Sequence, residues 1–246
     1  MDDHKALLKE VFGESSDSED YEQQQPEFEQ EDAINDKHEE SDQNPSWEQI
    51  KEIKGLWLCR HFLSPQQQSS LISAILNEGW FTEASHNQAM RFGDLPSWAT
   101  EISNSIYDEA KKEACPFPSD LLLREPLFDQ LIVNAYQPGE GISSHVDLMR
   151  FEDGIAIVSL ESSCVMHFTE VERTDCDVAN DRKMDLPMTK IPVYLTPGSL
   201  VLMSEEARYC WKHEINRKPG FQIWEGQELN QKRRISVTLR KLCKVE

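Results

Sequence analysis

Two hydrophobic periodicities divide this chain into a helical part and a strand part. Over residues 65–79 and 97–114, apolar side chains recur every three or four positions, which predicts two amphipathic helices. Ser64 and Pro65 supply an N-cap and a first-turn proline to the first helix, and Gly79 supplies its stop. The predicted buried positions are Leu71, Ile72, Ile75 and Leu76 in the first helix and Trp98, Ile102, Ile106 and Ala110 in the second.

From residue 128 onward the pattern changes to short apolar runs separated by turn signals such as Pro138-Gly139 and Pro197-Gly198. Many short strands favour a sandwich or jelly roll, and two helices ahead of them indicate α+β segregation. Residues 169–190 are charged and lack glycine, so we predict a long solvent loop there. The predicted strands cover residues 53–62, 128–136, 155–160, 164–168, 191–195, 200–204 and 234–242.

The first 45 residues differ in composition from the rest of the chain. They hold 16 Asp or Glu and 3 Lys, which is −13 of the net charge of −20, and the other 201 residues carry the remaining −7. A segment so poor in apolar residues cannot repay its ordering entropy, so we predict a disordered acidic tail over residues 1–45 and a domain over 46–246. Residues 4–12 carry four apolar side chains at helical spacing, which fits either a frayed tail or a short helix that binds a protein partner.

Composition also bears on location and partners. No run of 18 apolar residues is present and the N-terminus lacks the features of a signal peptide or presequence, so we expect a cytoplasmic or nuclear protein without a membrane span. The six cysteines form no C-x-x-C pair, which favours free thiols over a zinc ribbon. The acidic balance weighs against tight unaided binding to a long nucleic acid, because such binders usually present a basic face.

Candidate metal chemistry begins at His145-Val146-Asp147. Side chains two apart in a strand point to one face, so both could reach one metal ion. Two histidines and one carboxylate form the facial triad of non-haem Fe(II) oxygenases, and His213 is the candidate for the second histidine. A lone H-x-D motif also fits a surface turn, and His167 competes with His213 for the third place.

The last predicted strand alternates in polarity. Arg234, Ser236, Thr238 and Arg240 share one face of it, and Ile235, Val237 and Leu239 share the other. Buried arginines are costly unless they meet anions, so this face predicts either a site for a dicarboxylate or a basic outer surface. Asn134 and Tyr136 share a face of an earlier strand, either as further ligand contacts or as buried groups paired with the backbone.

These residues together resemble the AlkB family of Fe(II)/2-oxoglutarate dioxygenases, and in particular the oxygenase domain of its tRNA wobble-uridine hydroxylases. The resemblance covers about residues 50–244 and is carried by Asn134-x-Tyr136, Gly139-x-Gly141, His145-x-Asp147, Arg208-Tyr-x-Trp-x-His213 and Arg234-x5-Arg240. It implies a double-stranded β-helix core with the N-terminal helices packed on one side. It also implies that Fe(II) is held by His145, Asp147 and His213, and 2-oxoglutarate by Asn134, Tyr136, Arg234 and Arg240.

The resemblance further implies a reaction in which O₂ and 2-oxoglutarate are co-substrates. The expected activity is hydroxylation or oxidative demethylation of a modified base, in RNA or tRNA. Two alternatives remain: an oxygenase that acts on a protein, which the acidic surface would suit, and a catalytically silent scaffold that recruits a protein partner through its acidic tail.

Overall fold

The computed structural model describes residues 45–83, 86–112, 117–171 and 189–244. All but the last residue of the predicted tail at 1–45 and most of the loop predicted for 169–190 therefore lie outside the described residues. Within them, the double-stranded β-helix, or jelly roll, expected from the sequence is confirmed as two packed sheets with the helices on one side.

The larger sheet has seven strands in the order β1-β2-β9-β6-β13-β4-β3, and all of its pairs are antiparallel. Its strands are β1 (Ser46–Gln49), β2 (Leu56–Arg60), β9 (Leu200–Met203), β6 (Ile155–Leu160), β13 (Arg234–Arg240), β4 (Gln130–Tyr136) and β3 (Gln88–Phe92). The smaller sheet has the order β5-β10-β7-β8. Its strands are β5 (Ile142–His145), β10 (Trp211–Ile215), β7 (Cys164–Glu170) and β8 (Lys190–Leu195).

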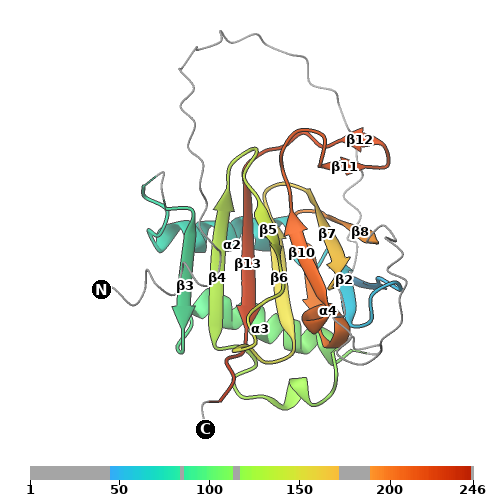
Figure 1. The fold of residues 1–246 in the computed structure, drawn as a ribbon. Coiled ribbons are helices and arrows are strands. Elements are labelled where there is room, and N and C mark those ends of the chain that lie inside the picture. The colour runs from blue at the N-terminus through green and yellow to red at the C-terminus, as the bar shows by residue number, and fades with distance from the viewer. Residues whose placement is uncertain (1–44, 84–85, 113–116, 172–188, 245–246) are drawn as a thin grey trace, which may run out of the picture. The chain divides into compact units, whose positions relative to one another are not determined.

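Helices α2 (Pro65–Asn77) and α3 (Ser97–Ala110) cover the outer face of the larger sheet, behind the strands in Figure 1. Helix α2 (Pro65–Asn77) begins at the predicted cap, where Ser64 and Gln67 form a reciprocal capping box. Helix α3 (Ser97–Ala110) buries all four predicted positions. Three shorter helical or hairpin features complete the described chain: η1 (Leu121–Leu123), α4 (Glu205–Tyr209) and the hairpin of β11 (Ile223–Trp224) with β12 (Gln227–Glu228).

Two apolar clusters fix the three layers. One packs α2 and α3 against the outward side chains of the larger sheet, including Ile235, Val237 and Leu239 of β13. The other fills part of the space between the two sheets, with Ile155 and Phe168 among its members. Because β13 is apolar on the helix side, its polar face points between the sheets, which decides between the two alternatives that the alternation left open.

The sequence pattern missed β1, β3, β5 and β10, and it overextended β2, since residues 51–55 form turns. Strands β3 and β5 lie at the edges of their sheets and are short, polar and partly exposed, so they carry little hydrophobic alternation. Gly141, just before β5, shows why glycine is needed there. A Cβ atom at this position would lie 1.9 Å from the carbonyl oxygen of Ile215, so only glycine permits this close approach to β10.

Candidate active site between the two sheets

The polar faces of β4 and β13 form one wall of the candidate site. Arg234 lies opposite Tyr136, Ser236 opposite Asn134, and Arg240 opposite Gln130. Residues directly opposite each other in an antiparallel pair point to the same side of the sheet, so all six face the space between the sheets. The four residues predicted to bind 2-oxoglutarate, Asn134, Tyr136, Arg234 and Arg240, are therefore brought together on one wall.

The other three predicted residues meet at the edge of the smaller sheet. His145 ends β5 and lies directly opposite His213 of β10, and the centres of the two imidazole rings are 4.3 Å apart. His213 Nε2 is 3.7 Å from Asp147 Oδ2. One ligand atom from each of His145, Asp147 and His213 lies within 4.8 Å of the others. Ligands about 2.0–2.2 Å from a shared ion lie only a few ångströms apart, so the three could hold one divalent metal.

The competing histidine lies on the wrong side of the smaller sheet. In the β7–β10 pair, Phe168 lies opposite His213 and His167 lies opposite Glu214. Neighbouring residues of a strand point to opposite faces, so His167 points away from the space between the sheets. Among the described residues, the cluster with metal-ligand geometry contains His213 and not His167.

The ring of His145 is oriented by its own strand. Its Nδ1 lies 2.8 Å from the carbonyl oxygen of Ser143. A carbonyl only accepts, so in this contact Nδ1 carries the proton and the lone pair of the neutral ring is on Nε2. A hydrogen bond of this kind is the usual way in which a metal-binding imidazole is held in one tautomer.

The electrostatics of the site favour a charged carboxylate and a neutral imidazole. Burial alone raises the pKa of Asp147, but Arg240, His213 and His145 together outweigh it and hold the pKa at about 2. Burial and the neighbouring His145 lower the pKa of His213 to about 4. Both side chains are thus in the protonation state that binds a metal cation over the whole physiological range.

Arg240 is bound to Asp147 rather than free for a ligand. Its Nη1 donates to Asp147 Oδ1, and its Nε donates to Gln130 Oε1 at 2.7 Å. The guanidinium also lies 4.0 Å from the ring centre of Phe151. Within the described residues only its Nη2 lacks a partner. The resemblance implied that Arg240 binds 2-oxoglutarate, and in the structure Arg240 also binds Asp147.

Arg234, in contrast to Arg240, keeps two of its donor nitrogens without a partner in the described residues. It is 0% exposed, and its Nη2 donates to Ser159 Oγ at 2.7 Å. Its Nε and Nη1 have no partner within the described part of the chain. Unmet donors on a buried cation are costly, and a carboxylate can accept charge-assisted hydrogen bonds from them. The side chain therefore fits the distal carboxylate of a dicarboxylic acid such as 2-oxoglutarate.

Tyr136 and Asn134 border this position. Burial raises the pKa of Tyr136 to about 12 although Arg234 acts in the opposite direction, so the phenol stays protonated and can donate. The guanidinium carbon of Arg234 lies 5.7 Å from the centre of the Tyr136 ring. Asn134 Oδ1 accepts a 2.6 Å hydrogen bond from Gln88 of β3, which orients the amide.

Sequence reasoning assigned no role to three residues that support the site: Gln130, Ser159 and Arg208. Gln130 could have been found, because it falls on the same alternation as Asn134 and Tyr136. Ser159 shares the inner face of β6, where nothing in the local sequence distinguishes it. Arg208 acts on a turn about sixty positions earlier, so no local pattern reveals that contact.

The buried, neutral His213 should make the stability of the metal-free protein depend on pH. Its folded pKa of about 4 lies below the ordinary 6.5, so the unfolded chain binds the proton first as the pH falls. We expect the metal-free protein to lose unfolding free energy as the pH falls from 6.5 towards 4, and His213→Gln to lose less of it. Chemical denaturation of both proteins in the presence of a chelator measures this. Parallel curves for the two would contradict the neutral, buried imidazole.

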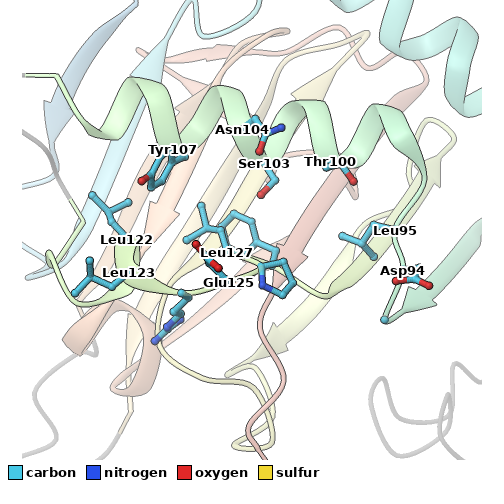
Figure 2. Close-up of a pocket in the computed structure, with 14 residues that line it drawn as sticks. Asp94, Leu95, Thr100, Ser103, Asn104, Tyr107, Leu122, Leu123, Glu125 and Leu127 are labelled. Atoms are coloured by element: carbon cyan, nitrogen blue, oxygen red, sulfur yellow. The ribbon is translucent and has the colours of Figure 1, made fainter.

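A separate groove of about 520 Å³ lies between α3 and the segment 121–128 (Figure 2). Ser103, Asn104 and Tyr107 of the helix face Leu122, Leu127 and neighbouring residues of the segment across it. None of the seven candidate residues lines this groove. The chemistry predicted from the sequence therefore belongs to the space between the sheets.

A jelly roll with two histidines and one carboxylate between its sheets is typical of the oxygenases that use non-haem Fe(II). The family described as the 2OG-Fe(II) oxygenase superfamily matches residues 55–240, and the chain belongs to it. The chain is accordingly a dioxygenase with Fe(II) and 2-oxoglutarate as its cofactors. Among the described residues, no helix is long and apolar enough to cross a membrane.

Particular relatives are AlkB homologues. The "Alkylated DNA repair protein ALKBH8 homolog" of Arabidopsis thaliana is 30% identical over 215 residues, which is 77% of this chain and 59% of that protein. The "tRNA (carboxymethyluridine(34)-5-O)-methyltransferase alkbh8" of Xenopus tropicalis is 29% identical over 190 residues, which is 70% of this chain and 27% of that protein. The chain thus spans less than two thirds of the length of either relative.

The solved structure of OsALKBH1 has the same fold. The two structures superpose with a TM-score of 0.53. The match covers 80% of this chain and 100% of the OsALKBH1 chain, and the sequences are 12% identical. At that identity the likeness concerns the fold alone.

Proposed function

We propose that this chain hydroxylates or oxidatively demethylates a modified base in RNA, with tRNA as the first candidate. Membership of the oxygenase superfamily supports the reaction class. The similarity to a protein named as a tRNA methyltransferase and to one named as an alkylated-DNA repair protein supports a nucleic-acid base as the substrate.

In this proposal, His145, Asp147 and His213 hold Fe(II) and leave its other positions open. Arg234 and Tyr136 bind the distal carboxylate of 2-oxoglutarate, Asn134 contacts the cofactor beside them, and Arg240 holds Asp147 and offers its remaining nitrogen to the other end of the cofactor. When bound, Fe(II) and 2-oxoglutarate supply with O₂ the oxidant for a substrate C–H bond, and succinate and CO₂ are released. The protein contributes ligation, positioning and a sheltered site.

The observation that carries the choice of a base is an exposed aromatic ring beside a cation near the triad. Phe92 ends β3 on the inward face, opposite Gln130, and is 39% exposed. The guanidinium of Arg150 lies 5.7 Å from the Phe92 ring centre, three residues after Asp147. Gln130 also binds Arg240, which holds Asp147, so the ring is only a few side chains from the candidate metal ligands. An aromatic face and an arginine suit a base and its phosphate.

Mass spectrometry of nucleosides tests this proposal. The purified full chain would be incubated with Fe(II), 2-oxoglutarate, O₂ and total tRNA, and the digested RNA compared with that treated with His145→Ala. We expect one modified nucleoside either to gain an oxygen atom or to lose a methyl group, with an equal amount of succinate formed. Arg150→Gln should lower the RNA-dependent succinate roughly tenfold to a hundredfold, since a charged contact contributes about 1.5–3 kcal/mol, and leave RNA-independent turnover unchanged.

A protein substrate is the second candidate, and the charge of the chain favours it. The net charge is −20, and −7 remains after the first 45 residues. A surface of this sign repels phosphates and attracts basic peptides. Succinate formed with protein fractions but not with tRNA would support it, and mass spectrometry would then find the added oxygen on a side chain.

A further inference from the structure

Arg208 is a buried arginine that binds the main chain immediately after Asp147. It is 1% exposed. Its Nη1 donates to the carbonyl oxygen of Asp147 at 2.9 Å, and its Nη2 donates to those of Leu148 at 2.7 Å and Phe151 at 3.0 Å. The guanidinium thus gathers three carbonyls of the turn 147–151 around one planar group.

The charge of Arg208 is met by carbonyl oxygens and not by a carboxylate. In the described part of the chain Arg208 forms no ion pair, and the Tyr209 ring centre lies 4.8 Å from its guanidinium carbon. Burying a charge without a carboxylate partner costs free energy unless hydrogen bonds satisfy its donors. The three carbonyl oxygens accept those hydrogen bonds, and only the forked donors of arginine can reach all three together.

Arg208 lies close in the chain to His213, the candidate metal ligand on β10. It lies in α4, five residues before His213, and α4 leads directly into β10. The far end of the turn is tied to the C-terminal segment instead, by hydrogen bonds from Glu152 to Lys241 and from Cys243 to Arg150. One short segment, residues 205–213, therefore carries a candidate metal ligand itself and grips the turn that carries another.

We infer that Arg208 is a positioning residue that fixes Asp147 relative to His213 and so sets the metal affinity of the site. The inference rests on the metal-binding role proposed for those two residues. Of the atoms of Asp147, Arg240 of β13 binds only the carboxylate and not the backbone. Arg208 holds the backbone carbonyls of Asp147, Leu148 and Phe151, so the turn keeps the Asp147 carboxylate near His213. Groups that hold metal ligands in place typically contribute about 10–100-fold to metal affinity.

Mn(II) binding to the full chain, without 2-oxoglutarate, tests the inference. Arg208→Lys keeps the charge but has a single nitrogen that cannot reach three carbonyls, and Arg208→Gln keeps part of the bonding without the charge. We expect Mn(II) to bind both variants about 10–100-fold more weakly. The visible spectrum of Co(II) should also change shape, because a displaced carboxylate alters the coordination geometry.

Arg217→Lys is the matched control. Arg217 is also 1% exposed, and its guanidinium binds the carbonyls of Gln137, Glu140 and Lys232, none of which is a metal ligand. This variant should show a similar loss of thermal stability while Mn(II) affinity stays within about threefold. If Arg208→Lys does not fold, Arg208→Gln carries the comparison, with circular dichroism as the check on folding.

The possible outcomes separate the inference from the proposed function. Mn(II) binding to His213→Ala as tight as to the wild type would overturn the metal-site assignment itself. Loss of binding in His213→Ala with unchanged binding in a folded Arg208 variant would overturn only the role of Arg208. Equal weakening in the Arg208 and Arg217 variants would also overturn it, because general loosening would then explain the effect.

Discussion

Replacing His145 or His213 with alanine is expected to abolish Fe(II) binding and succinate formation while the fold survives. The three candidate ligand atoms lie within 4.8 Å of one another, so removing one leaves too few ligands to hold the ion. Metal content after dialysis against Fe(II) under anaerobic conditions measures binding, and 2-oxoglutarate turnover measures the consequence. Circular dichroism of each variant establishes that the loss is local.

At Asp147, asparagine is a more conservative substitution than alanine for testing metal binding. Its carboxylate is the partner of the buried Arg240, and removing one member of a buried ion pair can cost about 3–5 kcal/mol. Asp147→Asn keeps the shape and one acceptor oxygen, so it should lose metal with less loss of stability. Asp147→Ala should lose both.

His167→Ala is the control for these variants, because His167 points away from the other histidines. It should retain metal and turnover. Full turnover in His213→Ala together with its loss in His167→Ala would show that the ligand assignment is wrong.

Replacing Arg234 with alanine is expected to raise the KM for 2-oxoglutarate roughly tenfold to a hundredfold or more. Two of its donors are buried without a partner within the described residues, which is the arrangement that a carboxylate satisfies. Loss of such a charge-assisted contact is equivalent to about 1.5–3 kcal/mol. Arg234→Lys should restore only part of the affinity, because an ammonium lacks the planar pair of donors. Steady-state kinetics with varied 2-oxoglutarate decide the matter.

Arg233→Ala is the adjacent control. Arg233 precedes β13 and pairs with Glu161, with its side chain about one-third exposed. Its loss should leave the KM for 2-oxoglutarate unchanged. Equal increases from Arg233→Ala and Arg234→Ala would contradict the role assigned to the inward face of β13.

The features predictable from the sequence were those set by local physics. The capping pattern at Ser64 and the apolar stripe from Trp98 to Ala110 depend on neighbours three or four positions away, and both helices form there. The alternation in 234–240 follows from the pleat of a single strand, so its polar and apolar faces could be told apart without knowing its partners, although not which of them points inward. His145 and Asp147 were found for the same reason, because two positions in one short segment suffice.

What only the tertiary structure decided is how distant segments meet. The sequence allowed His167 as the third ligand, and the register of β7 with β10 placed His213 on the inner face instead. The alternation of the last strand also gave no sign that Arg240 is bound to Asp147, 93 positions away in the chain. The hydrogen bonds from Arg208 to the turn that begins at Asp147 also join segments far apart in the chain. The register of strands far apart in sequence depends on the packing of whole layers, so no local pattern can encode these contacts.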